Sequence, residues 1–112
     1  MYLPLDPEGL SEALDQVASL GKSIYITETG VADRNDSLRQ QLLPIYFNVI
    51  NKKIAKGVDI KGTYLWTAWD NYEWNEGNTK SFGFFDENRN QRGSVTILKQ
   101  IINDGNYSPQ SI

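Results

Sequence analysis

Two groups of acidic and aromatic residues in this 112-residue chain have the types and spacing of candidate functional residues. Glu28 follows directly on the β-branched and aromatic run 24–27, and Gly30 permits a sharp turn just after it. A denser cluster over residues 66–76 holds three tryptophans and a tyrosine interleaved with carboxylates and amides. Indole rings offer flat apolar faces to the C–H side of a sugar ring, and carboxylates accept hydrogen bonds from its hydroxyls. This composition is typical of a carbohydrate site.

Simpler interpretations of these residues stay open at this stage. A single acid at a strand end, such as Glu28, is more often a solvated loop carboxylate, and at least one of Trp66 and Trp69 is expected in the core. Glu73 and Trp74 lie beyond the strand in a polar loop and are harder to explain by packing. A glycosidase pair would need carboxyl groups roughly 5–5.5 Å apart for retention or about 6.5–9.5 Å for inversion, and a sequence gives no distance.

The composition excludes several kinds of chemistry. The chain has no cysteine and no histidine, which rules out disulfides, thiolate nucleophiles, Cys/His zinc sites and Ser-His-Asp triads within it. Catalysis therefore has to use carboxylates, Tyr, Lys, Ser or Thr, or a bound cofactor. A formal charge of −3 provides no field that attracts phosphate backbones or anionic lipid, so neither nucleic acid nor a membrane is an expected partner.

The same composition bears on location in the cell. No run of 18 apolar residues is present, as a membrane-spanning helix would require. Residues 1–6 lack the basic region and the long apolar region of a secretory signal. Because the absence of cysteine also fits a reducing compartment, we expect a cytoplasmic protein.

The elements that position the candidate residues follow from hydrophobic periodicity. Apolar residues at three- and four-residue intervals predict helices, and β-branched and aromatic runs predict strands. In chain order we expect a helix over 7–20, a strand over 22–28, a helix over 37–56, a strand over 60–69, a short extended piece over 82–86, a helix over 94–104 and a loose tail over about 106–112.

Polar residues at the helix starts suggest how each helix is capped. Asp6 suits the N-cap of the first helix, the pair Ser37 and Gln40 resembles a capping box, and Ser94 suits the N-cap of the last helix. Pro44 interrupts the middle helix, so this helix either kinks or restarts there.

The connections between the two main strands are long, which makes these strands parallel. The strand over 22–28 shows little alternation, as expected of a strand covered on both faces. Ligands of such folds sit at the carboxyl ends of the strands, where Glu28 and the residues from Trp66 onward lie. Two parallel strands are not a finished sheet, so both need partners on their outer edges.

At these residues the chain resembles a known family. Residues 26–30, Ile-Thr-Glu-Thr-Gly, resemble the I/V-T-E-N-G signature around the catalytic nucleophile of family 1 glycoside hydrolases, which include the β-glucosidases. Residues 57–62, Trp66, 70–77 and 82–83 are similar to that family's G-V-D-V-R-G, W-S-x-x-D-N-F-E-W-x-x-G and F-G segments, in the same order. The resemblance implies an α/β fold, in which 1–112 form the C-terminal part of a (β/α)8 TIM barrel with strands like its seventh and eighth.

The resemblance also implies roles for individual residues. Glu28 corresponds to the nucleophile, Trp66 to the aromatic platform under the glycone sugar, and Glu73 to the acid that binds outer sugar hydroxyls. Trp74 corresponds to an indole N–H donor to the sugar, and Phe82 to a residue that lines the same pocket. No cofactor and no metal are implied. Because the family's 6-phospho-specific members usually lack Glu73 and Trp74, an unphosphorylated β-glycoside or small carbohydrate is the expected ligand.

Three departures from the family pattern stand out. Thr29 replaces the usual Asn, and Ser81 replaces the usual Arg, so both could alter how Glu28 is held. The T-x-N-E-P segment that supplies the family's acid/base is absent, since residues 75–77 are Asn-Glu-Gly. Retaining hydrolysis needs both an acid and a nucleophile. We therefore expect the isolated chain not to hydrolyse glycosides, and we expect the remaining part of the barrel to be its partner.

Two other functions are compatible with the sequence. The surface between Trp66 and Trp74 could belong to a non-catalytic carbohydrate-binding or interaction module. Alternatively, the chain could be a remnant without function that self-associates through its open strand edges.

Overall fold

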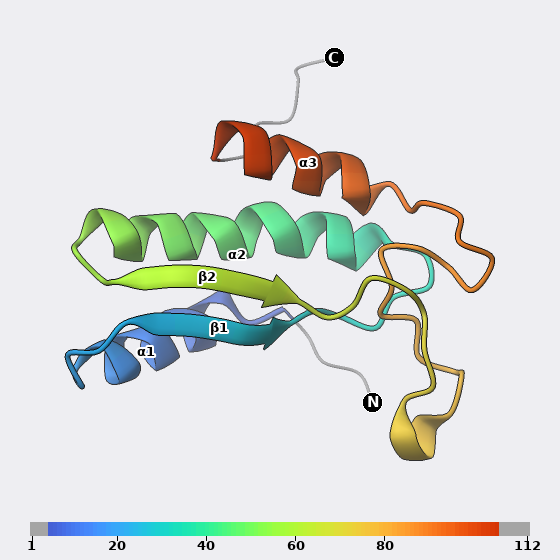
Figure 1. Cartoon of the computed structure of the whole chain (residues 1–112), viewed down its shortest axis with the longest axis horizontal. Coiled ribbons are helices and arrows are strands. Elements are labelled where there is room, and N and C mark those ends of the chain that lie inside the picture. Colours follow the sequence, from blue (N-terminus) through green and yellow to red (C-terminus); the bar gives the residue numbers. More distant parts are fainter. Residues whose placement is uncertain (1–4, 106–112) are drawn as a thin grey trace.

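Three α-helices, two parallel β-strands and one 3₁₀ turn make up residues 5–105, which are the part of the chain that the computed structural model describes. The elements are α1 (Pro7–Ala18), β1 (Ile24–Thr29), α2 (Ser37–Ala55), β2 (Ile60–Leu65), η1 (Trp74–Glu76) and α3 (Ser94–Asp104). This is the predicted order, a βαβ unit with a helix before it and another after it (Figure 1). The tail expected to be loose, 106–112, lies outside the described residues.

Helix α1 begins as predicted and is less buried than predicted. The Asp6 side chain accepts a hydrogen bond from the Gly9 N–H at 2.9 Å, and Pro7 occupies the first turn, where a missing N–H costs nothing. Leu14 is buried, but Leu20 is 70% exposed. The predicted apolar stripe therefore packs through Leu10 and Leu14, whereas Leu20 lies beyond the end of the helix at Ala18.

Helix α2 runs without a break from Ser37 to Ala55, so it does not restart at Pro44. The predicted capping box is wrong. Ser37 is the first helical residue, and the N-cap is Asp36, whose φ of 67° is left-handed and whose side chain makes no capping bond to α2. Gln40 instead donates to the Asp36 carboxylate at 3.1 Å.

Helix α3 ends at Asp104 and is capped by Gly105, whose φ of 77° suits a glycine, as predicted. The prediction that Ser94 caps this helix is wrong, because Ser94 is its first residue and the N-cap position is Gly93. The Ser94 N–H and Oγ–H both donate to the carboxylate of Asp36, each at 2.7 Å. The capping carboxylate therefore comes from the loop before α2 instead of from the sequence next to α3.

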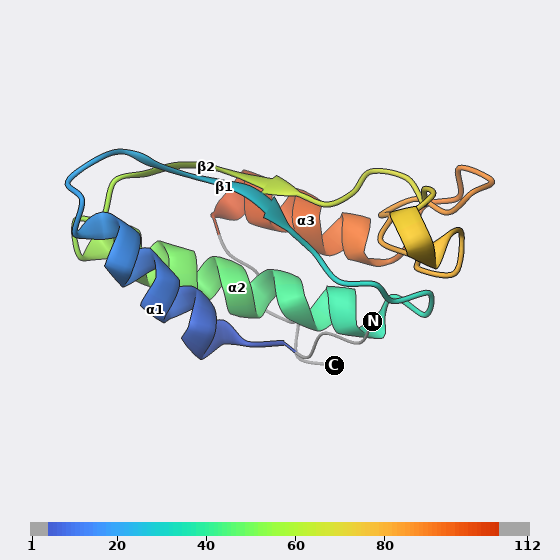
Figure 2. The same ribbon diagram turned by 90° about the horizontal axis from the view of Figure 1, so that it is seen from below.

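Strands β1 and β2 pair in parallel, with Ile24 opposite Ile60 and Thr29 opposite Leu65. Both arrows point toward the loops that follow β2 (Figure 1), and α1 and α2 lie on one side of the strands (Figure 2). The other face carries Tyr25, which is 58% exposed. Within residues 5–105 the helices cover the sheet from one side only, so the cover predicted for the second face stays a prediction.

Strand β2 is shorter than predicted, since it ends at Leu65 and not at Trp69. The Trp66 N–H donates to the Thr29 carbonyl at 2.8 Å and is the last such contact with β1. The backbone N–H and C=O of Thr67 then bond to Phe82 and Phe84, at 3.2 and 3.0 Å. Residues after Trp66 thus pair with the segment 82–85 instead of β1. This segment forms no regular strand, since Phe84 lies in a bend and Phe85 makes only isolated bridges.

The buried apolar side chains within residues 5–105 form two clusters. The smaller one joins α1, β1 and α2 through Leu14, Ile24 and Ile50. The larger one joins α2, α3 and the loops after the strands; its members are Val31, Leu42, Leu43, Phe84, Val95, Ile97 and Ile101. Packing in the larger cluster therefore holds the loops at the carboxyl ends of the strands. None of the described helices is long and apolar enough to cross a bilayer.

Truncation of the larger core should be costly. Leu43 is 0% exposed, so Leu43→Ala should lower the free energy of unfolding by about 2–5 kcal/mol through lost contacts and a residual cavity. Urea unfolding followed by circular dichroism measures this change. The matched variant Leu20→Ala, at a 70% exposed position, should change it by less than about 0.5 kcal/mol. Equal losses in the two variants would contradict this description of the core.

Candidate active site

A pocket of about 430 Å³ opens at the carboxyl ends of β1 and β2. It brings together four of the five predicted site residues, and its full lining is Leu5, Glu28, Thr29, Gly30, Val31, Leu42, Tyr46, Trp66, Glu73 and Phe82. Acidic and aromatic groups thus meet in one cavity although they come from segments up to 54 positions apart, Glu28 to Phe82. The roles of these residues stay predictions.

Glu28 lies one residue before the end of β1, and its side chain is exposed to the pocket. The backbone turns away two residues later, at Gly30. A Cβ at this position would collide with the carbonyl oxygen of Trp66, so only glycine allows the two segments to approach this closely. Glycine therefore allows the loop after Glu28 to lie directly against Trp66.

Trp66 and Glu73 are joined by a hydrogen bond from the indole Nε1–H to a carboxylate oxygen at 2.8 Å. The Trp66 side chain is 37% exposed and lines the pocket. The backbone around Glu73 is held by a turn, in which the Glu73 N–H donates to the Gly77 carbonyl at 2.8 Å. An apolar ring face and an oriented carboxylate thus lie side by side, which is the pairing that a sugar ring requires.

The structure does not bring Trp74 into this pocket. Trp74 begins η1, with a φ of 43°, and its side chain is 88% exposed. The expectation that Trp66 or Trp69 is in the core is wrong within residues 5–105, since Trp69 is also 47% exposed. The Trp69 ring is covered in part by the Arg89 guanidinium, 4.5 Å from the ring centroid.

Two residues near the site were not singled out by the sequence. Tyr46 lies at the apolar spacing of α2, yet it lines the pocket and its hydroxyl accepts the Asp6 N–H at 2.8 Å. Arg39, on the same helix, is 1% exposed and bonds to the loops beneath the pocket. The sequence does hold a signal for Arg39, which is an arginine at the spacing of an otherwise apolar helix stripe.

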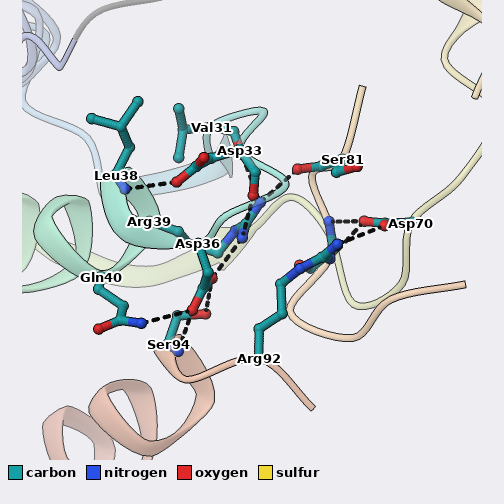
Figure 3. A network of polar contacts seen from close by, with 11 residues as sticks. Val31, Asp33, Asp36, Leu38, Arg39, Gln40, Asp70, Ser81, Arg92 and Ser94 are labelled. Carbon is teal, nitrogen blue, oxygen red and sulfur yellow. Dashed lines mark hydrogen bonds and ion pairs between the residues drawn. The ribbon is translucent and has the colours of Figure 1, made fainter. Parts of the chain in front are cut away.

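Asp70 belongs to the acidic and aromatic cluster, yet its carboxylate is engaged away from the pocket. It accepts two bonds from the Arg92 guanidinium, at 2.8 and 2.9 Å, and one from the Gly83 N–H at 2.8 Å (Figure 3). Burial raises the pKa of Asp70, but the bonds from Arg92 and Gly83 lower it and outweigh burial, so the pKa lies below its ordinary value. Asp70 therefore fixes the loops that carry Trp66 and Phe82.

No group of three or more Asp and Glu side chains within residues 5–105 is arranged to hold a metal ion.

The fold matches one portion of a (β/α)8 barrel. The β-glycosidase from Pyrococcus horikoshii aligns with a TM-score of 0.86 at 29% identity, over 94% of this chain and 26% of that protein. The β-glucosidase from Thermotoga maritima, solved in complex with a methoxycarbonyl-substituted glucoimidazole, aligns with a TM-score of 0.84 at 27% identity, over 92% of this chain and 27% of that one.

Sequence comparison agrees with the structural one. Residues 1–105 match the model of glycosyl hydrolase family 1, and the chain belongs to this family. It is 31% identical to a β-galactosidase of Pyrococcus woesei over 104 residues and 30% identical to β-glucosidase 47 of Arabidopsis thaliana over 110 residues. These alignments cover 88% and 87% of this chain, but 20% and 21% of the relatives. The chain thus spans about a fifth of the length of the curated relatives it matches.

The ion pair of Asp70 should make stability sensitive to acid. Because the folded-state pKa lies below the ordinary value of 3.8, the stabilisation is complete above that value and is lost as the pH falls through the lowered pKa. Asp70→Asn should lower stability at pH 7, by leaving Arg92 buried without its partner, and should reduce the further loss below pH 3.8.

Urea unfolding from pH 7 to pH 2 measures both effects. Asp104→Asn, at the exposed end of α3, is the matched control and should keep the acid dependence of the unchanged chain. An Asp70→Asn chain with the full acid dependence would show that another carboxylate is responsible.

Proposed function

We propose that this chain supplies the nucleophile and part of the glycone-binding wall of a retaining β-glycosidase. The observation that carries the proposal is the pocket at the strand ends, in which Glu28 lies together with Trp66, Glu73 and Phe82. Membership of glycosyl hydrolase family 1 and the resemblance of residues 26–30 to the family signature support it.

In the proposed reaction, the Glu28 carboxylate attacks the anomeric carbon and forms an ester with the sugar, while the bond to the leaving oxygen breaks. A second carboxyl group, about 5–5.5 Å from the first in retaining enzymes, protonates that oxygen and later activates water. In the described chain the other pocket acid is Glu73, which already accepts the Trp66 indole N–H. Glu73 is therefore suited to binding a sugar hydroxyl, and the acid/base comes from another part of the barrel.

The bare side of the sheet supports a partner of this kind. Tyr25 and Tyr64 are 58% and 61% exposed, and a Cβ at Gly62, between them, would meet both rings. In a complete barrel this face is the inner one and is covered by the other strands. We propose that the remaining barrel strands cover it and pair with the open strand edges.

Nucleophile and acid can be tested separately with different leaving groups. The pure chain should release no nitrophenol from 4-nitrophenyl β-D-glucoside above the uncatalysed rate, because nothing protonates the leaving oxygen. 2,4-Dinitrophenyl 2-deoxy-2-fluoro-β-D-glucoside should instead label the chain once, since dinitrophenolate leaves with its electron pair and needs no acid.

Peptide mass spectrometry should locate the label on Glu28. The variant Glu28→Gln should take up no label, and Glu12→Gln, which changes an exposed acid on α1, should be labelled like the unchanged chain. If the pure chain turned over the nitrophenyl glucoside and Glu28→Gln abolished that turnover, the proposal that the chain lacks the acid/base would be contradicted. Absence of any label would contradict a nucleophile site in this chain.

A non-catalytic carbohydrate-binding surface is the second candidate, and the 88% exposure of Trp74 favours it. The two functions depend on different tryptophans. The test ligand is deoxynojirimycin, which was solved in complex with the Thermotoga maritima β-glucosidase. If this ligand binds in the pocket at the strand ends, Trp66→Ala should weaken its binding by about tenfold or more, and Trp74→Ala should have little effect. An exposed binding surface requires the reverse order, with no covalent labelling. Titration followed by tryptophan fluorescence measures both.

A further inference from the structure

We propose that Arg39 is a positioning residue whose guanidinium fixes the separation between the loop after Glu28 and the segment that carries Phe82, and so sets the shape of the pocket between them. The inference rests on the proposed carbohydrate-binding function of this pocket. Arg39 itself does not line the pocket and therefore acts through the residues it holds.

The guanidinium bonds to both segments at once (Figure 3). Nη2 donates to the Val31 carbonyl at 3.1 Å and to the Ser81 carbonyl at 2.6 Å. Nη1 donates to the Asp33 carbonyl at 3.0 Å. Val31 and Phe82, the residue after Ser81, both line the pocket. The Arg39 side chain thus links the two segments that form different parts of the pocket lining.

Backbone contacts pass this constraint on to Trp66. The Asp33 N–H donates to the same Ser81 carbonyl at 2.8 Å, which closes a short link between the two segments. Trp66 lies between them, because its own N–H bonds to Thr29 and the next N–H, of Thr67, bonds to Phe82. A change in the spacing of the two segments therefore has to move the Trp66 ring.

The chemistry of this contact requires an arginine. A guanidinium is a rigid planar fork of N–H donors that can satisfy several carbonyls in different directions, whereas the lysine ammonium presents all its donors on one atom. The charge is balanced by Asp36, whose Oδ1 lies 2.6 Å from Nη1, with both side chains almost fully buried. Lysine at this position would keep the ion pair but could not hold all the carbonyls.

The same helix offers a matched control. Lys53 is also a buried cation of α2, 8% exposed, and its Nζ pairs with Asp15 of α1 at 2.7 Å. It makes no contact with the pocket. A second control is Ser81→Ala, because the Ser81 Oγ is buried with no hydrogen-bond partner among residues 5–105 and only its carbonyl takes part in the link.

The experiment compares Arg39→Lys, Lys53→Met and Ser81→Ala in the full-length ¹⁵N-labelled chain. Three quantities are measured: the indole N–H resonance of Trp66, the exchange rate of the Asp33 amide, and the dissociation constant for deoxynojirimycin. Arg39→Lys should shift and broaden the indole resonance, speed the exchange by about tenfold and raise the dissociation constant by about tenfold. Lys53→Met should lower the urea midpoint without changing these quantities, and Ser81→Ala should leave all of them unchanged.

Several results would overturn the inference. An unchanged Trp66 resonance and Asp33 exchange in Arg39→Lys would show that the guanidinium fork is not needed. The same changes in Lys53→Met, or loss of folding in Arg39→Lys, would show that Arg39 serves general stability. If the unchanged chain binds no deoxynojirimycin, the proposed sugar-binding function fails, while the resonance and the exchange rate still decide the role of Arg39.

Discussion

The buried pair of Arg39 and Asp36 is the contact on which separate parts of the molecule converge. Removing two charges from water costs several kcal/mol for each ion, and such pairs persist where further hydrogen bonds compensate them. Burial raises the pKa of Asp36, but the hydrogen bonds from Arg39, Ser94 and Gln40 outweigh burial. The pKa therefore lies below its ordinary value, and the carboxylate stays charged. Through Asp36 the pair holds α3, and through Arg39 it holds the loops that follow both strands.

With these loops fixed, the pocket is a consequence of parallel pairing. Parallel strands present their carboxyl ends at the same edge, so Glu28 near the end of β1 and Trp66 just after β2 have to be neighbours. The half-covered sheet follows from the same geometry. Helices connect parallel strands from outside, and a βαβ unit alone has nothing to place on the inner face, where Tyr25 is exposed.

The features that were predicted from sequence are those with local signals. The start of α1 after Asp6 and the end of α3 before Gly105 depend on residues within one turn, and the parallel direction of the strands follows from the length of their connection. The caps of α2 and α3 were predicted wrongly because Asp36 serves a helix 58 positions along the chain, which no local pattern reveals. The pocket position of Tyr46 and the exposure of Trp74 likewise depend on tertiary packing.

The capping of α3 has a consequence for the order in which the chain acquires structure. A helix as short as α3 is marginal by itself, and its first turn here obtains its carboxylate from a distant loop. Contacts between residues far apart in sequence form late, because a long loop has to close before they contribute. We therefore expect the βαβ unit to fold first and α3 to dock last, which would couple completion of the C-terminal helix to correct formation of the loop between Glu28 and α2.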